Sequence, residues 1–178
     1  MGWRRQLRQL ILGGARSGKS RLAEERAKQS GLEVVYIATA QVKDKEMAER
    51  VELHRQGRPS NWQVIEEPLL LADRLRDLSD QNKVVIVDCL TLWLTNLLLI
   101  SEDEMLKGMT DLEEAVTHYA GELYLVSNEV GWGIVPMGEL SRKFQDNTGR
   151  LHQALAACVE RVTLCVAGIP LEVKGNQN

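Results

Sequence analysis

The stretch Gly13-Gly14-Ala15-Arg16-Ser17-Gly18-Lys19-Ser20 fits the pattern G-x-x-x-x-G-K-[ST] of a phosphate-binding loop. Gly13 and Gly18 allow backbone turns that aim N–H groups at phosphate oxygens, and the helix that follows adds the positive end of its dipole. Lys19 is expected to reach the β- and γ-phosphates of a nucleotide, and the Ser20 hydroxyl to bind Mg²⁺. A chance match in a chain of this length occurs on the order of once in a hundred. Because an apolar stretch precedes the loop and a helical pattern follows it, the phosphate-binding interpretation is favoured.

Working outward from this loop, apolar strand-like stretches alternate with helical patterns. The clearest strand contains Val84–Val87, a continuous apolar run of the kind that parallel strands buried on both faces show. This alternation predicts βαβ units, and therefore an α/β fold with a mostly parallel central sheet flanked by helices. Ligands of such sheets bind beyond the carboxyl ends of the strands. The expected strands are 7–12, 33–38, 62–65, 83–87, 122–126, 161–167 and 171–174. The expected helices are 19–29, 43–56, 69–78, 92–100, 110–119 and 139–160. Thr110 is expected to cap the fifth helix, and the sixth could break at Gly149.

Two strand ends carry acidic candidates. Asp88 follows Val84–Val87, which is the Walker B arrangement, and such an acid lies beside the phosphate loop and orients Mg²⁺ or its water. The alternative is an acid that ends a strand or caps the next helix. Asn128-Glu129 either contacts substrate or catalytic water, or forms a turn in which Asn tolerates unusual φ.

The composition indicates one globular domain. At 178 residues and 20.0 kDa, residues 1–178 are expected to form a single P-loop domain with flexible ends at 1–6 and 175–178. A formal net charge of −3 argues against a broad nucleic-acid surface. Three scattered cysteines without a CxxC pair indicate a reducing compartment, and the longest apolar run, 92–100, is too short to span a bilayer. We therefore expect a cytoplasmic protein without nucleic-acid partners or stable membrane insertion.

The motifs alone leave the class of P-loop protein open. A signalling GTPase is disfavoured, because Asn82-Lys83 continues into a strand instead of an N-K-x-D loop, and the D-x-x-G match at 146–149 lies in a helical pattern. A small-molecule kinase without guanylyl transfer and a RecA-like nucleotide-binding ATPase module remain as alternatives. Phosphoryl transfer in any of these enzymes requires Mg²⁺ for charge neutralisation.

Five stretches together resemble one family: GGARSGKS at 13–20, YIATAQ at 36–41, EMAERVELHRQGRPSNW at 46–62, VDCLTLWLTNLL at 87–98 and VSNEVGWGIVP at 126–136. They are similar to the bifunctional adenosylcobinamide kinase/adenosylcobinamide-phosphate guanylyltransferases of cobalamin assembly, over about residues 8–174. The resemblance implies a RecA-like P-loop fold and a homotrimer. It also implies two reactions. A nucleoside triphosphate, ATP or GTP, phosphorylates adenosylcobinamide, and GTP then donates GMP to adenosylcobinamide phosphate through a GMP-histidine, giving adenosyl-GDP-cobinamide.

Carried over by position, the GMP-bearing histidine falls on His54, and Lys19 is the second catalytic residue. Leu53 precedes His54, whereas some members have two adjacent histidines, and the Walker B acid, Glu in some members, is Asp88 here. A hydrogen-bonded boundary histidine is the alternative for His54, since it shares a helix face with Met47 and Val51. The resemblance places nucleotide contacts on Gly13, Gly14, Ala15, Arg16, Ser17, Gly18, Lys19, Ser20, Ala38, Thr39, Ala40, Arg55, Gln56, Gly57, Arg58, Glu66 and Asp88, and Mg²⁺ on Ser20 and Asp88.

Several further side chains have two interpretations each. His118 and His152 are expected to be structural or solvated. The helix around Trp93 is expected in the core, with a subunit interface as the second reading, and Trp132 could contact the corrin or a neighbouring subunit. Three basic residues could neutralise phosphate charge or simply be solvated; these are Arg142, Lys143 and Arg150.

Overall fold

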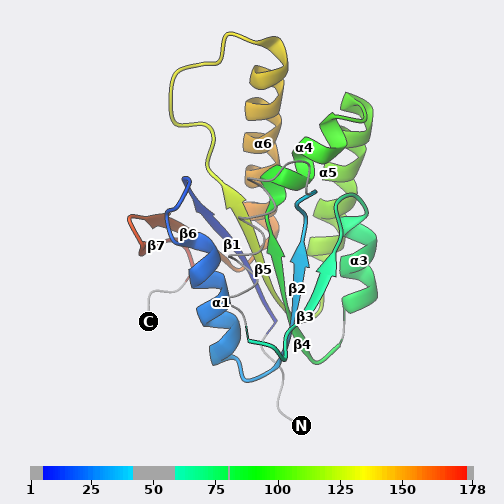
Figure 1. Cartoon of the computed structure of the whole chain (residues 1–178), viewed down its shortest axis with the longest axis vertical. Helices are drawn as coiled ribbons and strands as arrows, with labels where there is room; N and C mark the ends of the chain where they lie inside the picture. Colours follow the sequence, from blue (N-terminus) through cyan, green and yellow to red (C-terminus); the bar gives the residue numbers. More distant parts are fainter. Residues whose placement is uncertain (1–5, 42–58, 80, 176–178) are drawn as a thin grey trace.

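The computed structural model describes residues 6–41, 59–79 and 81–175. These residues form a seven-stranded sheet of order β3-β2-β4-β5-β1-β6-β7 (Figure 1). Every neighbouring pair is parallel except β6 and β7, so the predicted mostly parallel sheet is confirmed. The strands are β1 (Leu7–Gly13), β2 (Glu33–Ala38), β3 (Gln63–Glu66), β4 (Lys83–Asp88), β5 (Glu122–Asn128), β6 (Arg161–Val166) and β7 (Ile169–Lys174).

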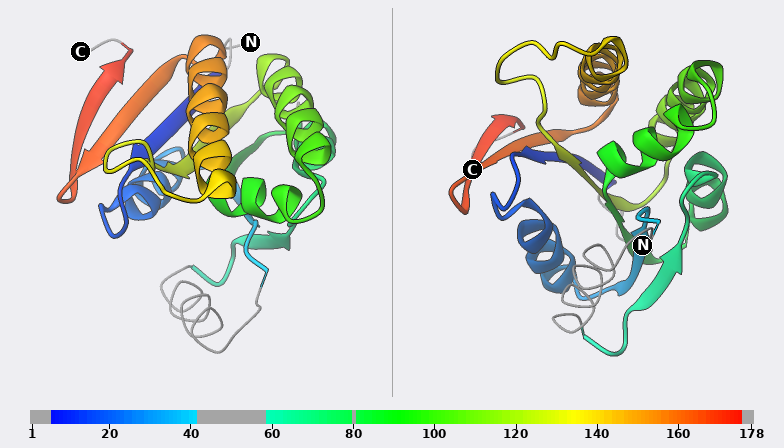
Figure 2. Two further views of the ribbon diagram at one scale, coloured as in Figure 1. Left: turned by 90° about the horizontal axis from the view of Figure 1, so that it is seen from above. Right: turned by 45° about the horizontal axis from the view of Figure 1, so that its top comes forward.

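Helices cover both faces of the sheet (Figure 2). Helix α1 lies on one face, and its Ala23 and Ala27 pack with Tyr36 and Ile86 of the strands. Among the described residues, the other face carries α3 to α6, and its core surrounds Trp93. The helices are α1 (Lys19–Gln29), α3 (Leu71–Leu78), α4 (Leu90–Leu98), α5 (Glu102–Thr117) and α6 (Glu139–Cys158).

The central strands are buried on both faces, as their continuous apolar sequences require. Val84–Val87 of β4 are fully inaccessible to solvent. Trp93 is 1% exposed, and Leu94 and Leu97 of the same helix are also buried. Helix α4 is therefore part of the core, and the alternative reading of this apolar helix as a subunit interface is wrong for these three side chains.

The expected start of one helix is wrong, and the possible break in another is absent. Helix α5 begins at Glu102 instead of Thr110, because Ser101 caps it: the Ser101 Oγ accepts the Glu104 N–H at 3.1 Å. Thr110 lies within the helix and donates to the Leu106 carbonyl. Helix α6 continues through Gly149 without a break. The helix expected at 43–56 lies outside the described residues.

In the described part of the chain, no helix is both long enough and apolar enough to span a membrane.

Candidate functional site

The phosphate-binding loop connects β1 to α1 at the carboxyl edge of the sheet (Figure 1). Gly18, which precedes the helix, has a φ of 93°, and Arg16 has a φ of 55°. A side chain at Gly18 would be strained, because L residues rarely adopt that conformation. Lys19 is 8% exposed, and its Nζ donates to the Gly14 carbonyl at 2.9 Å. The lysine therefore lies folded over the loop, where phosphate oxygens are expected.

Gly13 is required by close packing. A Cβ built on it would lie 2.8 Å from the Cys165 carbonyl oxygen of β6 and would overlap the Ser17 hydroxyl. Ser17 Oγ is buried and has no hydrogen-bond partner among the described residues. The loop thus closes tightly on itself at Ser17.

The turn between β6 and β7 supports the phosphate loop from the other side. Ala167 and Gly168 have φ values of 50° and 78°, which is typical of a two-residue hairpin turn. The Gly168 N–H donates to the Ser17 carbonyl at 2.9 Å. A Cβ on Gly18 would lie 3.1 Å from the Gly168 Cα. A turn about 150 residues away in sequence therefore fixes the loop backbone.

Asp88 ends β4 and is held by a tyrosine. The Tyr36 hydroxyl donates to Asp88 Oδ2 at 2.6 Å. In the sheet, β5 lies between β4 and β1, and the placement of Asp88 beside the phosphate loop stays a prediction. Two strand spacings, about 10 Å, lie between the two strands. Asp88 therefore faces the site from across β5.

Thr39 joins the ends of β2 and β4. Its Oγ1 accepts the Cys89 N–H at 2.9 Å and donates to the Cys89 carbonyl at 2.7 Å. Asn96 donates to the Thr39 carbonyl at 2.9 Å. Thr39 is fully buried, so its side chain holds the strand ends in place, and Ala38 and Ala40 beside it are half-buried.

Glu66 ends β3 and is exposed, paired in register with Ala38 of β2. The next residue, Glu67, is buried instead. Its Oε1 accepts the Leu70 N–H at 2.8 Å, so it organises the turn into α3.

The Lys19 ammonium lowers the pKa of two cysteine thiols, at the ends of β4 and β6. Burial and the neighbouring Asp88 carboxylate raise the pKa of the Cys89 thiol, while Lys19 lowers it. Burial likewise raises the pKa of Cys165, against which Arg26 and Lys19 act. Both thiols are therefore neutral side chains at the edges of a site whose central charge is the Lys19 ammonium.

The end of β5 lies directly next to the phosphate loop. Asn128 pairs with Gly13 in the sheet, and the Glu129 N–H donates to the Gly13 carbonyl at 2.9 Å. Asn128 Nδ2 donates to Thr91 Oγ1 at 2.9 Å, so this amide is held by α4. Glu129 is therefore placed where it can contact a substrate at this edge of the sheet.

His152 of α6 adjoins this strand end. It is 7% exposed, its Nε2 lies 2.8 Å from Ser127 Oγ, and its Nδ1 lies 4.0 Å from Glu129 Oε2. Burial lowers the pKa of His152, and the Glu129 carboxylate acts in the opposite direction. Sequence reasoning missed Ser127 and Tyr36, because each lies inside an apolar strand and nothing in the strand pattern distinguishes it. It also missed the contact between His152 and Glu129.

The three predicted basic residues of α6 each make contacts elsewhere. Arg142 donates to the Pro136 carbonyl, Lys143 to Glu102, and Arg150 to Asn147, so none is directed at the phosphate loop by these contacts. His118 is exposed, as expected for a solvated residue. The described residues hold no group of three or more His, Cys, Asp or Glu side chains placed to bind a metal. His54, Arg55, Gln56, Gly57 and Arg58 lie outside the described residues.

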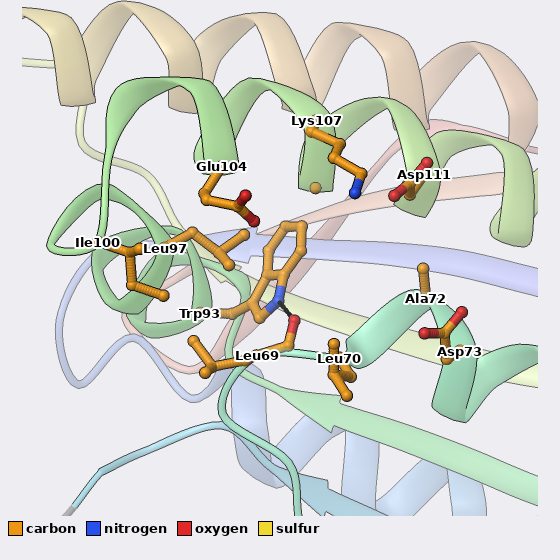
Figure 3. Close-up of a pocket in the computed structure, with 11 residues that line it drawn as sticks. Leu69, Leu70, Ala72, Asp73, Trp93, Leu97, Ile100, Glu104, Lys107 and Asp111 are labelled. Atoms are coloured by element: carbon orange, nitrogen blue, oxygen red, sulfur yellow. Dashed lines mark hydrogen bonds between the residues drawn. The ribbon is translucent and has the colours of Figure 1, made fainter.

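A separate pocket of about 200 Å³ lies between α3, α4 and α5 (Figure 3). The Trp93 indole forms its floor, and its Nε1 donates to the Leu69 carbonyl at 2.9 Å. Glu104, Lys107 and Asp111 of α5 stand along one side. Its lining residues come from α3, α4, α5 and their connections, and include no predicted nucleotide contact. This pocket is therefore distinct from the phosphate-loop site.

Comparison with known proteins assigns the family. Residues 9–173 match the family model described as cobinamide kinase / cobinamide phosphate guanyltransferase (CobU). The chain belongs to this family. It is 55% identical, over 95% of its length and 98% of the relative's, to the bifunctional adenosylcobalamin biosynthesis protein CobP of Pseudomonas aeruginosa. It is 40% identical to the bifunctional CobU protein of Escherichia coli K12, over 93% of this chain and 98% of that protein.

Solved structures with little sequence identity show how this CobU-family chain folds. A Pyrococcus horikoshii protein at 12% identity has a TM-score of 0.58 and covers 99% of this chain and 90% of its own. The RadB recombinase, at 13% identity, has a TM-score of 0.50 over 89% of this chain and 73% of its own. The predicted RecA-like P-loop fold is confirmed.

Proposed function

We propose that this chain phosphorylates adenosylcobinamide with ATP or GTP and then transfers GMP from GTP to adenosylcobinamide phosphate. The observation that carries the proposal is a complete phosphate loop, Gly13–Ser20, in a chain that matches a family described by both activities over residues 9–173. Relatives called bifunctional align with nearly the whole chain. We further propose that the enzyme works in the cytoplasm and has no nucleic-acid partner.

In the kinase step, Lys19 is the residue that responds to developing charge. Its ammonium donates to the neutral Gly14 carbonyl. Phosphate oxygens are stronger acceptors, because a charge-assisted hydrogen bond is roughly twice as strong as a neutral one. A bound triphosphate therefore draws Lys19 onto its β- and γ-phosphates. The loop N–H groups hold the phosphates, and Ala38–Ala40 and Glu66 at the ends of β2 and β3 are proposed to hold the nucleoside.

We assign Mg²⁺ to Ser20 and Asp88. Both side chains present hard oxygen donors, and Mg²⁺ usually takes one or two protein oxygens together with substrate phosphates. The Tyr36 hydroxyl fixes one Asp88 oxygen, and the other is proposed as the metal ligand. When bound, the ion neutralises charge on the phosphates.

The guanylyl transfer is proposed to run through His54, with Arg55–Arg58 near the phosphate. An imidazole with a pKa near 6.5 is a neutral nucleophile at pH 7, and attack on the α-phosphorus of GTP gives a GMP-phosphoramidate and pyrophosphate. The covalent intermediate splits one difficult displacement into two easier ones.

Intact mass spectrometry after incubation with GTP and Mg²⁺ tests this proposal. The wild-type chain should gain one GMP and release pyrophosphate, and the adduct should be acid-labile and base-stable, as a P–N bond requires. His54→Ala should form no adduct and transfer no GMP, yet keep measurable kinase activity. His118→Ala is the matched control and should behave as wild type.

Two outcomes would contradict the proposal. Kinase turnover without any adduct in the wild type would identify a plain small-molecule kinase. Triphosphate hydrolysis to inorganic phosphate with no transfer to adenosylcobinamide would identify an ATPase module.

We also propose a homotrimer, joined through an exposed apolar segment. The segment that leaves β5 and enters α6 extends beyond the carboxyl ends of the strands (Figure 1, yellow). We call residues 130–140 the apolar arm, because its large apolar side chains are mostly exposed, up to 97% for Met137. An apolar patch of this kind marks an interaction surface. The side chains are Trp132, Ile134, Val135, Met137 and Leu140.

A further inference from the structure

The end of β5 carries polar side chains that the nucleotide-binding set leaves unused. Ser127, His152 and Glu129 form a line of hydroxyl, imidazole and carboxylate, with Oγ to Nε2 at 2.8 Å and Nδ1 to Oε2 at 4.0 Å. The line runs from the buried sheet toward the loop that binds phosphate. The exposure of the three side chains rises along it, from 0% at Ser127 to 19% at Glu129.

The chemistry of the three groups sets the direction of their hydrogen bonds. Burial favours the neutral imidazole of His152, which has one N–H. An ionised carboxylate only accepts, so the proton belongs on Nδ1, where it faces Glu129. Nε2 then accepts the Ser127 hydroxyl proton. Ser127 thereby holds the ring so that Nδ1 faces the Glu129 carboxylate, 4.0 Å from Oε2.

Glu129 is also held by the main chain. Its N–H donates to the Gly13 carbonyl at 2.9 Å, and its Oε1 accepts the Gly131 N–H at 2.7 Å. Oε2 is the oxygen on the His152 side. The backbone of Glu129 is therefore anchored to the phosphate loop, and its carboxylate is oriented by the Gly131 N–H, with the His152 ring 4.0 Å away.

Position distinguishes Glu129 from the other carboxylates at this edge. Asp88 lies two strands from β1 and accepts from Tyr36, and Glu66 lies at the far edge strand β3. Among the described residues that follow the strands on this side, Glu129 is the carboxylate on the strand adjacent to β1. A proton acceptor for a reaction at the γ-phosphate is best placed there.

We propose that Glu129 accepts the proton of the substrate hydroxyl in the kinase step, and that His152 and Ser127 position it; this rests on the function proposed above. The hydroxyl oxygen bonds to the γ-phosphorus, and the bond from that phosphorus to the β,γ-bridging oxygen breaks. Its electron pair leaves with the nucleoside diphosphate. The hydroxyl proton moves to Glu129 Oε2 and is later released to water.

The second reaction does not need this acceptor. Its acceptor substrate is a phosphate monoester, whose second pKa near 6 leaves it mostly ionised at neutral pH. Its nucleophile in the first half is a neutral imidazole. Glu129 is therefore specific to the first of the two reactions. The Ser127-His152-Glu129 line is also not a hydrolase triad, because Ser127 is fully buried and no substrate carbonyl can reach its hydroxyl.

Glu129→Gln tests the acceptor role. The glutamine carbonyl can keep the contact to the Gly131 N–H, but the side chain cannot take a proton. Kinase turnover should fall by about 100-fold or more, the usual contribution of a positioned base. GMP adduct formation from GTP and guanylyl transfer to supplied adenosylcobinamide phosphate should stay at wild-type rates. Glu122→Gln, at the amino end of the same strand, is the control and should leave both reactions unchanged.

His152→Gln and Ser127→Ala test the positioning roles. Both should lower kinase kcat by about tenfold, within the range for outer partners of a reacting group, with the nucleotide KM and adduct formation unchanged. A merely structural role would not confine the loss to kinase kcat while leaving the nucleotide KM and adduct formation unchanged.

The outcomes separate this inference from the proposed function. If Glu129→Gln keeps kinase turnover close to wild type, the acceptor role is wrong, and the bifunctional assignment stands. If Glu129→Gln loses adduct formation along with kinase activity, Glu129 serves the nucleotide in both steps and the inference is equally overturned. If the wild-type chain forms no adduct, it is the proposed function that fails.

Discussion

His152 illustrates how one buried side chain can couple the site to the stability of the whole fold. Burial lowers its pKa in the folded protein below the ordinary value near 6.5 that it regains on unfolding. As the pH falls below about 6.5, the unfolded chain therefore binds a proton that the folded chain does not. The folded state loses stability over that range, at up to about 1.4 kcal/mol per pH unit for one proton.

We expect the free energy of unfolding, measured by urea titration, to fall between pH 7.5 and pH 5.5 more steeply in the wild type than in His152→Gln. His118→Gln should keep the wild-type slope, because His118 is exposed. Equal slopes in wild type and His152→Gln would show that the buried imidazole does not titrate on unfolding.

Among the secondary-structure elements, helix α5 shows that the N-cap residue sets where a helix begins. Ser101 and Glu104 form the S-x-x-E arrangement, and Glu102, Asp103 and Glu104 place negative charge at the amino end of the helix. Ser101→Ala should lower the free energy of unfolding by about 1 kcal/mol, because it removes the acceptor for the Glu104 N–H. Thr110→Ala, within the same helix, should change it by less than about 0.5 kcal/mol. Comparable losses in the two variants would place the start of the helix near Thr110 after all. Urea unfolding at neutral pH measures both.

Sequence reasoning predicted the features set by local patterns and missed those set by tertiary contacts. The apolar run before Asp88 and the glycine pattern at 13–20 predicted buried parallel strands and the phosphate loop, because both signals are local and follow from geometry. The start of α5 was predicted at Thr110, and the Ser101 cap was missed. The contact of Gly168 with Ser17 and the line from His152 to Glu129 could not be predicted, since each joins residues that only the tertiary fold brings together.

For the whole molecule, the apolar arm determines how copies of the chain associate. Light scattering at micromolar protein should give about three times 20.0 kDa, the mass of one chain. Ile134→Asp combined with Met137→Asp should reduce this to one chain, because a charge buried in an apolar contact is costly. Leu99→Asp with Ile100→Asp, an exposed apolar pair beside the α3–α5 pocket, is the control and should remain trimeric. A wild-type chain that is monomeric and fully active in both reactions would end the trimer proposal.

The place of β1 in the sheet has a consequence for how the protein is made. The ribosome releases β1 and the phosphate loop before their partners: β1 pairs with β5 and β6, and the loop rests on the turn at 167–168. Arg8 and Gln9 bond to Glu160 and Thr163, more than 150 positions later. Such distant pairings make folding slow, because the long loop must close before its contacts form. A nascent chain should therefore gain nucleotide affinity only after β6 and the turn at 167–168 have left the exit tunnel, so chains that end before this turn would not compete for the cell's GTP.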